Sequence, residues 1–539
     1  MMFNRSLFPQ AKKELEEERR ACLRRARDIS FILNAEIPAV ALPLEILREI
    51  FEWHLASCDA HGWMTICWVC TQWRAVALNA PALWTNIRVT GRQEPLKAYL
   101  ERSQAMPLSM TGKLADPELG ESFTDSETWA LALAHASRVQ SFCVDWRACY
   151  DTDFVLNPSP PFSCIRHLRV QTHTVFITNQ GPFKQSETFI LGMRARKSQL
   201  TELELLGFPF PVCSTLFHPQ LKRLALSNVD WGTCMRPWPS LLSALEELTS
   251  LRELCLLYDL PRTHSASSPA ASVALPQLQR LELSSYGDTC MAQTAFLVSS
   301  LRLPNLRLME VTTGHLTEEG HPALCTLLRH VNSTLACCTH PSTLRSLYLD
   351  RTLVEDGLSL RIWQEELPLA VSSTQDAPLP VFALDIQCKP ERYDAFIDSL
   401  RHLPLSSLHH LAIHAGIRGD AAFPRLSAAF GQAQDVRTMS MCGEGVLWLL
   451  DALKPLPNKV PFSRLTQLKF VGPSRSHGFS TAHLVNCLKE RLQEDCASKL
   501  EQLTLEVDFF HEVDGEVPEG LVSEVVVCQR LPEDLDWMI

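Results

Sequence analysis

Cysteine and histidine side chains gather early in the chain at spacings that would suit a zinc ion. Five of them fall within a short stretch: His54, Cys58, His61, Cys67 and Cys70. Thiolate and imidazole groups are the ligands that zinc prefers in proteins. The group formed by Cys337, Cys338 and His340 is less suitable, because adjacent cysteines rarely bind one ion together. Cys67 and Cys70 also fit a helix pattern, and no second Cys-x-x-Cys pair follows at finger-like spacing, so we expect no metal site.

Motifs for catalysis are missing from the sequence. It has no Gly-x-Ser-x-Gly elbow, no His-Glu-x-x-His pair and no glycine-rich loop that could hold a phosphate. Its 18 histidines are scattered, its glycines number only 21, and nothing marks out one cysteine as a nucleophile. We therefore expect a protein that catalyses no reaction and needs no cofactor.

The composition indicates a folded protein in a reducing compartment. Of the 539 residues, 46% are hydrophobic and 21% charged, and the net charge is -11. Nucleic acid recruits basic surfaces, so this balance disfavours it as a partner. No apolar run of about 18 residues and no secretory leader are present, so we expect no membrane span. The 19 cysteines form no disulfide pattern, which favours the cytoplasm or the nucleus.

Three helical segments are predicted at the start of the chain. The first covers residues 11–34, and its apolar stripe consists of Leu15, Cys22, Ala26, Ile29 and Leu33. This helix either packs on the residues that follow or pairs with a second copy. Two shorter apolar helices are predicted at 42–51 and 66–77. A module this small leaves part of its apolar surface for a partner or a neighbouring domain.

The residues of this module resemble an F-box. They read Leu-Pro-x-Glu-Ile-Leu-x-x-Ile-Phe from Leu42, Val-Cys-x-x-Trp-Arg-x-x-Ala from Val69, and Pro-x-Leu-Trp from Pro81. The match covers residues 38–87, and its three blocks stand in the order seen in fungal F-box proteins. The segment His54–Met64 departs from the family, which commonly has a leucine-rich second helix there.

The resemblance implies that the module docks onto the small Skp adaptor of a cullin-based ubiquitin ligase. The adaptor contacts that it implies are Leu42, Pro43, Ile46, Leu47, Ile50, Phe51, Val69, Cys70 and Trp73. Leu47 and Val69 would fit equally well in the module's own core. Pro43 has little to bury internally, which favours contact with the adaptor.

One hexad, apolar-x-x-apolar-x-apolar, recurs through the rest of the chain. Its copies begin at Val139, Ile165, Leu200, Leu221, Leu251, Leu278, Leu306, Leu344, Val381, Leu408, Val436, Leu465 and Leu500. Successive copies start 21 to 38 residues apart, a pattern typical of leucine-rich repeats with irregular periods. The alternation predicts short parallel strands stacked side by side. Outer helices are predicted at 239–248, 294–301, 322–331 and 481–493.

Polar residues between the apolar positions of the hexads face the inner, concave surface of the predicted sheet. The candidate target-binding residues are Glu202, Glu204, Arg223, Glu253, Arg280, Glu282, Glu310, Tyr348, Asp385, His410 and Lys469. Acidic and basic residues are mixed on this face, so it does not predict a ligand that carries charges of one sign only.

The predicted fold class is α/β: a small all-α, F-box-like module followed by a leucine-rich repeat solenoid. Its parts are an N-terminal helix (1–37), the F-box-like module (38–90), a linker or cap (91–138), the repeat array (139–510) and an acidic cap or tail (511–539). In that tail, Leu521–Cys528 is predicted as a final capping strand. The resemblance implies a substrate-recruiting subunit of a Skp-cullin-F-box ligase, whose repeats bind an unknown target protein. The alternative is a repeat scaffold without a link to ubiquitination.

Overall fold

Each of the predicted hexads contains the start of a β-strand. In the computed structural model the series runs from β3 (Val139–Trp146) to β18 (Leu500–Asp508). The described residues are 8–35, 37–39, 42–58, 62–114, 126–146, 162–172, 182–232, 234–258, 260–261, 272–286, 290–337, 344–351, 357–367, 377–389, 392–413, 429–430, 433–442, 453, 462–471, 481–493, 499–508, 517–518 and 520–530. His61, Cys338, His340 and the end of the acidic tail lie outside them.

The chain divides into two units, Met1–Leu200 and Thr201–Ile539. In the first unit the helices are α1 (Phe8–Ala35), α2 (Leu44–Ser57), α3 (Thr71–Leu78), α4 (Gln93–Arg102), α5 (Ser126–Leu133) and α6 (Pro182–Met193). Its 3₁₀ turns are η1 (Gly62–Trp68), η2 (Pro81–Trp84), η4 (Ala136–Arg138) and η5 (Arg194–Gln199). Its strands are β1 (Asn86–Val89), β2 (Leu108–Leu114), β3 and β4 (His167–Thr172).

The sheet of the first unit begins two strands earlier than the sequence predicts. Strands β1 to β4 pair in parallel and in chain order, so the expected first strand at Val139 is in fact the third. Gly112 of β2 lies close to the Trp129 ring of α5, where a Cβ atom would come within 2.6 Å of that ring. Nearby, Trp63, Trp84 and Tyr99 pack edge to face, with Trp84 5.1 Å from Trp63 and 5.0 Å from Tyr99 between ring centroids.

The prediction of one continuous helix at 66–77 is wrong. The structure has the 3₁₀ turn η1 up to Trp68, a break, and then α3 from Thr71. The break arises because Cys70 is extended and acts as the N-cap of α3, its sulfur accepting the Trp73 backbone N–H at 3.4 Å. A side chain that satisfies a free N–H at a helix start favours a new helix there.

The second unit carries the longer series of strands. They are β5 (Glu202–Leu206), β6 (Arg223–Ser227), β7 (Glu253–Tyr258), β8 (Val273–Ala274), β9 (Arg280–Ser285), β10 (Leu301–Arg302), β11 (Leu308–His315), β12 (Ser346–Arg351), β13 (Gly357–Trp363), β14 (Phe382–Gln387), β15 (His410–Ile413), β16 (Thr438–Cys442), β17 (Gln467–Val471), β18 and β19 (Val522–Arg530). Its helices are α7 (Phe210–Ser214), α8 (Pro237–Glu246), α9 (Cys290–Ser299), α10 (Gly320–Cys337), α11 (Tyr393–Ser399) and α14 (Thr481–Gln493). Two 3₁₀ turns, η7 (Leu400–His402) and η8 (Leu405–Ser407), follow α11.

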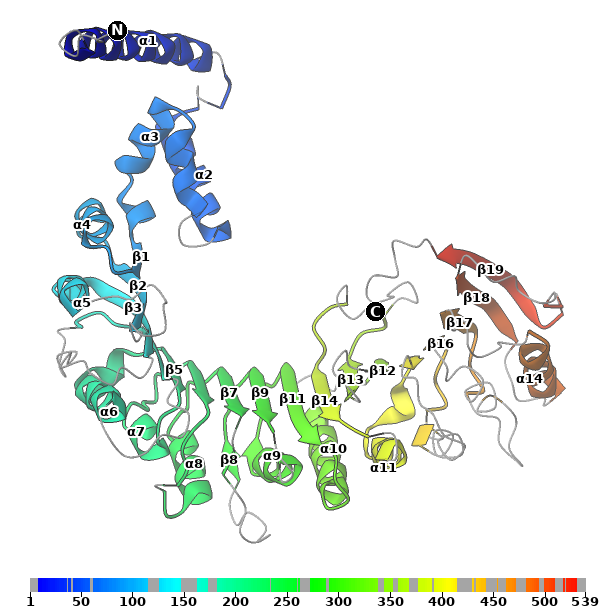
Figure 1. Cartoon of the computed structure of the whole chain (residues 1–539). Helices are drawn as coiled ribbons and strands as arrows, with labels where there is room; N and C mark the ends of the chain where they lie inside the picture. Colours follow the sequence, from blue (N-terminus) through cyan, green and yellow to red (C-terminus); the bar gives the residue numbers. More distant parts are fainter. Residues whose placement is uncertain are drawn as a thin grey trace, which may run out of the picture. The chain divides into compact units, whose positions relative to one another are not determined.

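Strand order in the second unit departs from the expected sequential stack. Strands β5, β6, β7, β9 and β11 pair in parallel, but the next neighbour of β11 is β14, followed by β13, β12 and β15 (Figure 1). Strand β13 is antiparallel to both of its neighbours. The stack then continues in parallel from β15 to β19. Strands formed by successive hexads are therefore neighbours in the sheet, except for β12 and β14.

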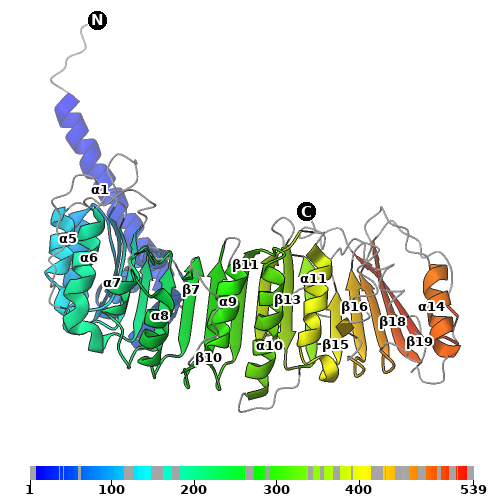
Figure 2. The ribbon, with the colours of Figure 1, turned by 90° about the horizontal axis from the view of Figure 1, so that it is seen from below.

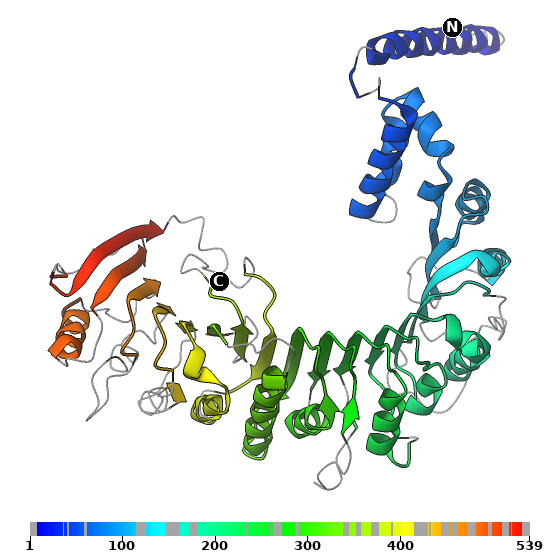
Figure 3. The same cartoon turned by 180° about the vertical axis from the view of Figure 1, so that it is seen from behind.

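The two faces of this sheet differ in what covers them. Leucines at alternate positions, such as Leu203 and Leu205 of β5, are buried on one face. Helices α8, α9 and α10 lie on that side, in front of the strands in Figure 2 and beneath them in Figure 3. Trp238 of α8 packs on Phe296 of α9 at 4.7 Å between ring centroids. Burying each such side chain stabilises the fold by roughly 1.5–3 kcal/mol.

The α/β fold class is confirmed, and most strands are parallel. The four outer helices predicted from the sequence are present as α8, α9, α10 and α14, although α10 continues to Cys337, beyond the expected end at residue 331. The predicted capping strand at Leu521–Cys528 is present as β19, parallel to β18. Within the described part of the chain, helices are too short or too polar to cross a bilayer.

Candidate functional site

Helix α2 buries one apolar face inside the first unit. It begins after Pro43, whose carbonyl accepts the Leu47 backbone N–H at 3.0 Å. Leu47 and Phe51 are fully buried, and the Phe51 ring packs edge-on against Trp73 of α3 at 5.2 Å between centroids. In Figure 1, α2 and α3 lie side by side. Phe51 therefore holds the two helices together, and Leu47 is buried on the same face of α2.

An adjoining face of α2 is apolar as well, but it is open to solvent. Ile46, Ile50 and Trp53 are 42%, 43% and 77% exposed. Their spacing of four and three residues places them on one face, because an α-helix has 3.6 residues per turn. Globular helices usually pair one apolar face with a polar one. Two apolar faces on one helix indicate that the second is covered by something outside the described residues.

A second group of exposed apolar side chains precedes α3. Trp68 is 76% exposed and Val69 is 54% exposed, where η1 ends. Val69 comes directly before the N-cap Cys70, so it belongs neither to η1 nor to α3. Large apolar side chains exposed on two elements of one small module are typical of an interaction surface.

The nine predicted adaptor contacts thus fall into three sets. Pro43, Ile46, Ile50 and Val69 are exposed; Leu42, Cys70 and Trp73 are half-buried; Leu47 and Phe51 are buried. Trp53 and Trp68 were missed at the sequence level. The signal for Trp53 was its place seven residues after Ile46 on the same helical face.

The eleven polar positions predicted on the sheet share one face of the second unit. The pairing register places Glu202, Arg223, Glu253 and Arg280 in one row across four strands. Arg223 lies 3.5 Å from the Glu253 carboxylate. Arg280 lies 2.7 Å from Glu310 and 3.2 Å from Glu282, so the charges on this part of the face neutralise one another in part.

Further along the sheet the same face is covered. Tyr348, His410 and Lys469, which were predicted to be available to a target, are at most 5% exposed. The residues after β13 fold over this region: Trp363 donates its indole N–H to the Pro378 carbonyl at 2.6 Å, and Leu367 packs with Tyr348. Of the predicted face, the part from β5 to β11 is therefore the more accessible one.

Burial shifts the pKa of two side chains on this face. Burial lowers the pKa of His410 to about 4. The nearby Glu366 carboxylate acts to raise this pKa, and the Lys469 ammonium acts to lower it. The imidazole Nδ1 lies 2.7 Å from the Thr438 hydroxyl. Burial, with the nearby Glu282 carboxylate, raises the pKa of Cys255 to about 12. Nucleophilic cysteines have lowered pKa values, so Cys255 is a protonated, structural thiol.

Two exposed tyrosines and one arginine were not predicted. Tyr258 and Tyr286 stack with ring centroids 5.8 Å apart at the ends of β7 and β9. Tyr258 has φ of 81°, which is unusual for a residue with a side chain. Arg361 of β13 donates to the Asp385 carboxylate at 2.8 Å. The alternating Leu358, Leu360 and Ile362 was the sequence signal for β13.

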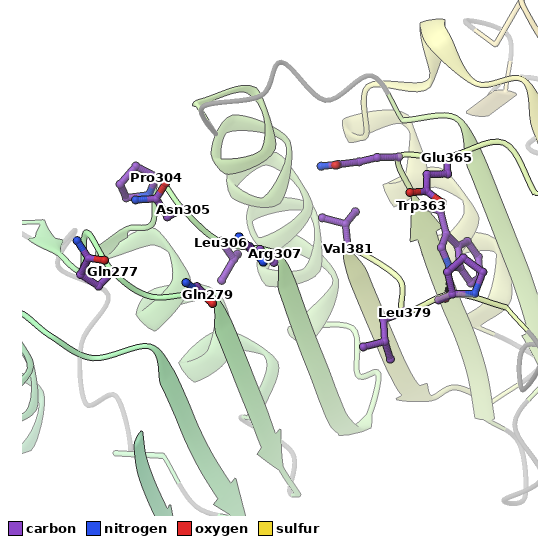
Figure 4. A pocket seen from close by; sticks show the side chains of 12 residues that line it. Gln277, Gln279, Pro304, Asn305, Leu306, Arg307, Trp363, Glu365, Leu379 and Val381 are labelled. Carbon is purple, nitrogen blue, oxygen red and sulfur yellow. Dashed lines mark hydrogen bonds between the residues drawn. The ribbon is translucent and has the colours of Figure 1, made fainter. Parts of the chain in front are cut away.

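A cavity of about 500 Å³ lies in the second unit where β9 and β11 begin. Figure 4 shows Gln279 and Arg307 on one side and Trp363, Glu365 and Leu379 on the other. The polar side chains of its lining are amides, the cation Arg307 and the anion Glu365. Such a mixture does not indicate one class of small ligand. Among the described residues, no group of three or more His, Cys, Asp or Glu side chains is placed to hold a metal ion.

No protein-family model matches the chain, and no curated protein matches it either.

Proposed function

We propose that this chain is a substrate-recruiting subunit of a Skp-cullin-F-box type ubiquitin ligase. In this role the helical module of residues 38–90 binds the Skp adaptor, and through it a cullin. The leucine-rich repeat solenoid binds the target protein. The subunit catalyses nothing itself; it raises the concentration of the target near the transferring enzyme.

The observation that carries the proposal is the second apolar face of α2. Ile46 and Ile50 are residues for which the F-box pattern implies adaptor contact, and both are exposed in the free chain. Covering such side chains with a partner removes apolar surface from water, worth roughly 1.5–3 kcal/mol for each large side chain. Trp53 and Trp68 extend the surface, and tryptophans are enriched among residues that dominate binding energy.

The other predicted contacts act indirectly in this proposal. Leu47, Phe51 and Trp73 fix α2 against α3, and Cys70 starts α3 at the residue that leaves Val69 exposed. These four residues position the docking surface without forming its centre.

The target surface is the accessible part of the polar sheet face, from β5 to β11. Its half-exposed charged side chains, among them Glu253, Arg280 and Glu310, offer several hydrogen-bonding groups of both signs. A partner with a matching pattern of charges would be selected over one that leaves charges unpaired.

Titration calorimetry of the purified full-length chain with purified Skp adaptor tests the proposal. The variant Ile46→Asp/Ile50→Asp should bind at least about 100-fold more weakly, because each lost anchor costs about 2 kcal/mol. Both side chains are exposed, so its melting temperature should stay close to that of the wild type. Glu45→Ala/Glu52→Ala, at exposed polar positions of the same helix, is the matched control and should bind normally.

Two results would contradict the proposal. A wild-type chain that fails to bind the adaptor favours the alternative of a repeat scaffold with no link to ubiquitination. Unchanged binding by the Ile46→Asp/Ile50→Asp variant would show that the adaptor docks elsewhere.

A further inference from the structure

Helix α1 exposes an apolar stripe that nothing in the described structure covers. Every described side chain from Ala11 to Leu33 is exposed, and the large apolar ones are between 49% and 65% exposed. An amphipathic helix is normally held by burial of its apolar face, because helix propensity alone gives marginal stability in water. The stripe of α1 therefore requires an occupant.

The stripe follows a regular spacing. Leu15, Cys22 and Ile29 recur every seven residues, and Ala26 and Leu33 fill the turns beside them. At 3.6 residues per turn these five positions stay within a narrow arc, with Arg19 at its border. This is the spacing by which two helices pack along their length.

Charge is divided along α1. Its acidic block consists of Glu14, Glu16, Glu17 and Glu18, which Lys12 and Lys13 precede, and its basic block of Arg19, Arg20, Arg24, Arg25 and Arg27, which Asp28 follows. In a reversed copy centred near Cys22, Glu18 of one chain comes beside Arg25 of the other, and this pair supplies the charge complementarity on the flank of the stripe.

We propose that α1 pairs with α1 of a second copy of this chain in an antiparallel arrangement. The pair is centred near Cys22, so that Leu15 of one copy packs on Ile29 of the other. Glu18 and Arg25 lie on the same flank of the stripe, seven residues apart. In the reversed pair, Glu18 of each copy comes beside Arg25 of the other, which forms two equivalent ion pairs. A parallel pair in register would instead place Glu18 level with Glu18 and Arg25 level with Arg25.

Light scattering of the full-length chain coupled to gel filtration is the first test. The expected mass is twice the 60.7 kDa of one chain. Leu15→Asp/Ile29→Asp should raise the dissociation constant of the dimer by at least about 100-fold, because charge is placed inside the seam. Glu17→Ala/Arg24→Ala, on the far side of the helix, is the matched control and should remain dimeric. A monomeric wild type, or a dimer that survives Leu15→Asp/Ile29→Asp, overturns the proposal.

Charge exchange tests the antiparallel direction. Glu18→Arg alone and Arg25→Glu alone should each weaken the dimer, and the double variant should restore it, since each ion pair is then re-formed with reversed signs. Oxidation by diamide should link the two chains through Cys22, and Cys22→Ser should abolish that link. Failure of the double variant to restore the dimer, or no link through Cys22, contradicts the antiparallel arrangement. Adaptor binding is measured separately at Ile46 and Ile50, so each proposal can fail alone.

Discussion

Acidification should weaken the second unit through one buried histidine. His410 of β15 is 5% exposed, and burial lowers its pKa to about 4 from the ordinary 6.5. Glu366 opposes the shift and Lys469 adds to it, while Thr438 lies within hydrogen-bond distance of the ring. In the unfolded chain the imidazole regains its ordinary pKa. The unfolded state therefore binds a proton at a higher pH than the folded state.

The sign and size of the effect follow from linkage. Between pH 6.5 and pH 4 the unfolded imidazole is protonated and the folded one is neutral. Stability is therefore fully present above pH 6.5 and is lost as the pH falls toward 4. A pKa difference of one unit is worth about 1.4 kcal/mol, so the loss at pH 4.5 is about 2.5 kcal/mol of unfolding free energy.

Urea denaturation at pH 7.5 and pH 4.5 measures this loss against His410→Gln. Other groups titrate in both proteins, so the relevant quantity is the difference in unfolding free energy between wild type and variant. Between pH 7.5 and pH 4.5 the wild type should lose about 2.5 kcal/mol more unfolding free energy than His410→Gln loses. His315→Gln, at an exposed histidine, is the matched control. A shift below about 0.5 kcal/mol would refute the conclusion that the folded protein keeps His410 neutral.

Three substitutions test the packing. Gly112→Ala should cost about 1–3 kcal/mol in urea denaturation, because its Cβ would come within 2.6 Å of Trp129; Gly520→Ala, with nothing within 4 Å, should be silent. Trp363→Ala should cost about 3–5 kcal/mol, whereas Trp53→Ala at an exposed site should cost little. Cys70→Ala removes the N-cap of α3 and should lower stability by about 1 kcal/mol, and Cys70→Ser should restore it. Equal effects at Gly112 and Gly520, a mild Trp363→Ala, or no rescue by serine would contradict these assignments.

Strand positions were predictable because the hexad carries its own period. Leu203 and Leu205 alternate with Glu202 and Glu204, and a period of two on a half-buried surface specifies a strand whatever its neighbours are. The first strands β1 and β2 were missed since Asn86–Val89 and Leu108–Leu114 do not follow the hexad.

The order of the strands was less predictable. The hexads that form β12 and β14 look alike, and hydrogen bonds between strands are made by backbone groups that are identical in every residue. The antiparallel β13 decides the arrangement, because it returns the chain from β12 to a place beside β11. That choice depends on packing between residues far apart in the sequence, such as Tyr348 with Ala412.

The candidate docking surface was predictable in location and only partly in detail. The sequence places apolar residues on two adjoining faces of α2, but it does not say which face meets α3. The structure buries Leu47 and Phe51 and exposes Ile46 and Ile50, because Phe51 packs on Trp73. On the sheet, alternation placed the polar residues on one face, yet it gave no sign that the residues after β13 cover Tyr348.

In the proposed function, the Skp adaptor binds to the exposed side of the helical module. Hydroxyl-radical footprinting of the full-length chain, with and without purified adaptor, tests it most directly. Trp53 and Trp68, now 77% and 76% exposed, should become several-fold less oxidised in the complex. Trp231, half-buried against Phe210 in the second unit, should not change. A complex in which Trp53 and Trp68 are oxidised as readily as before, or no complex at all, would contradict binding at this surface.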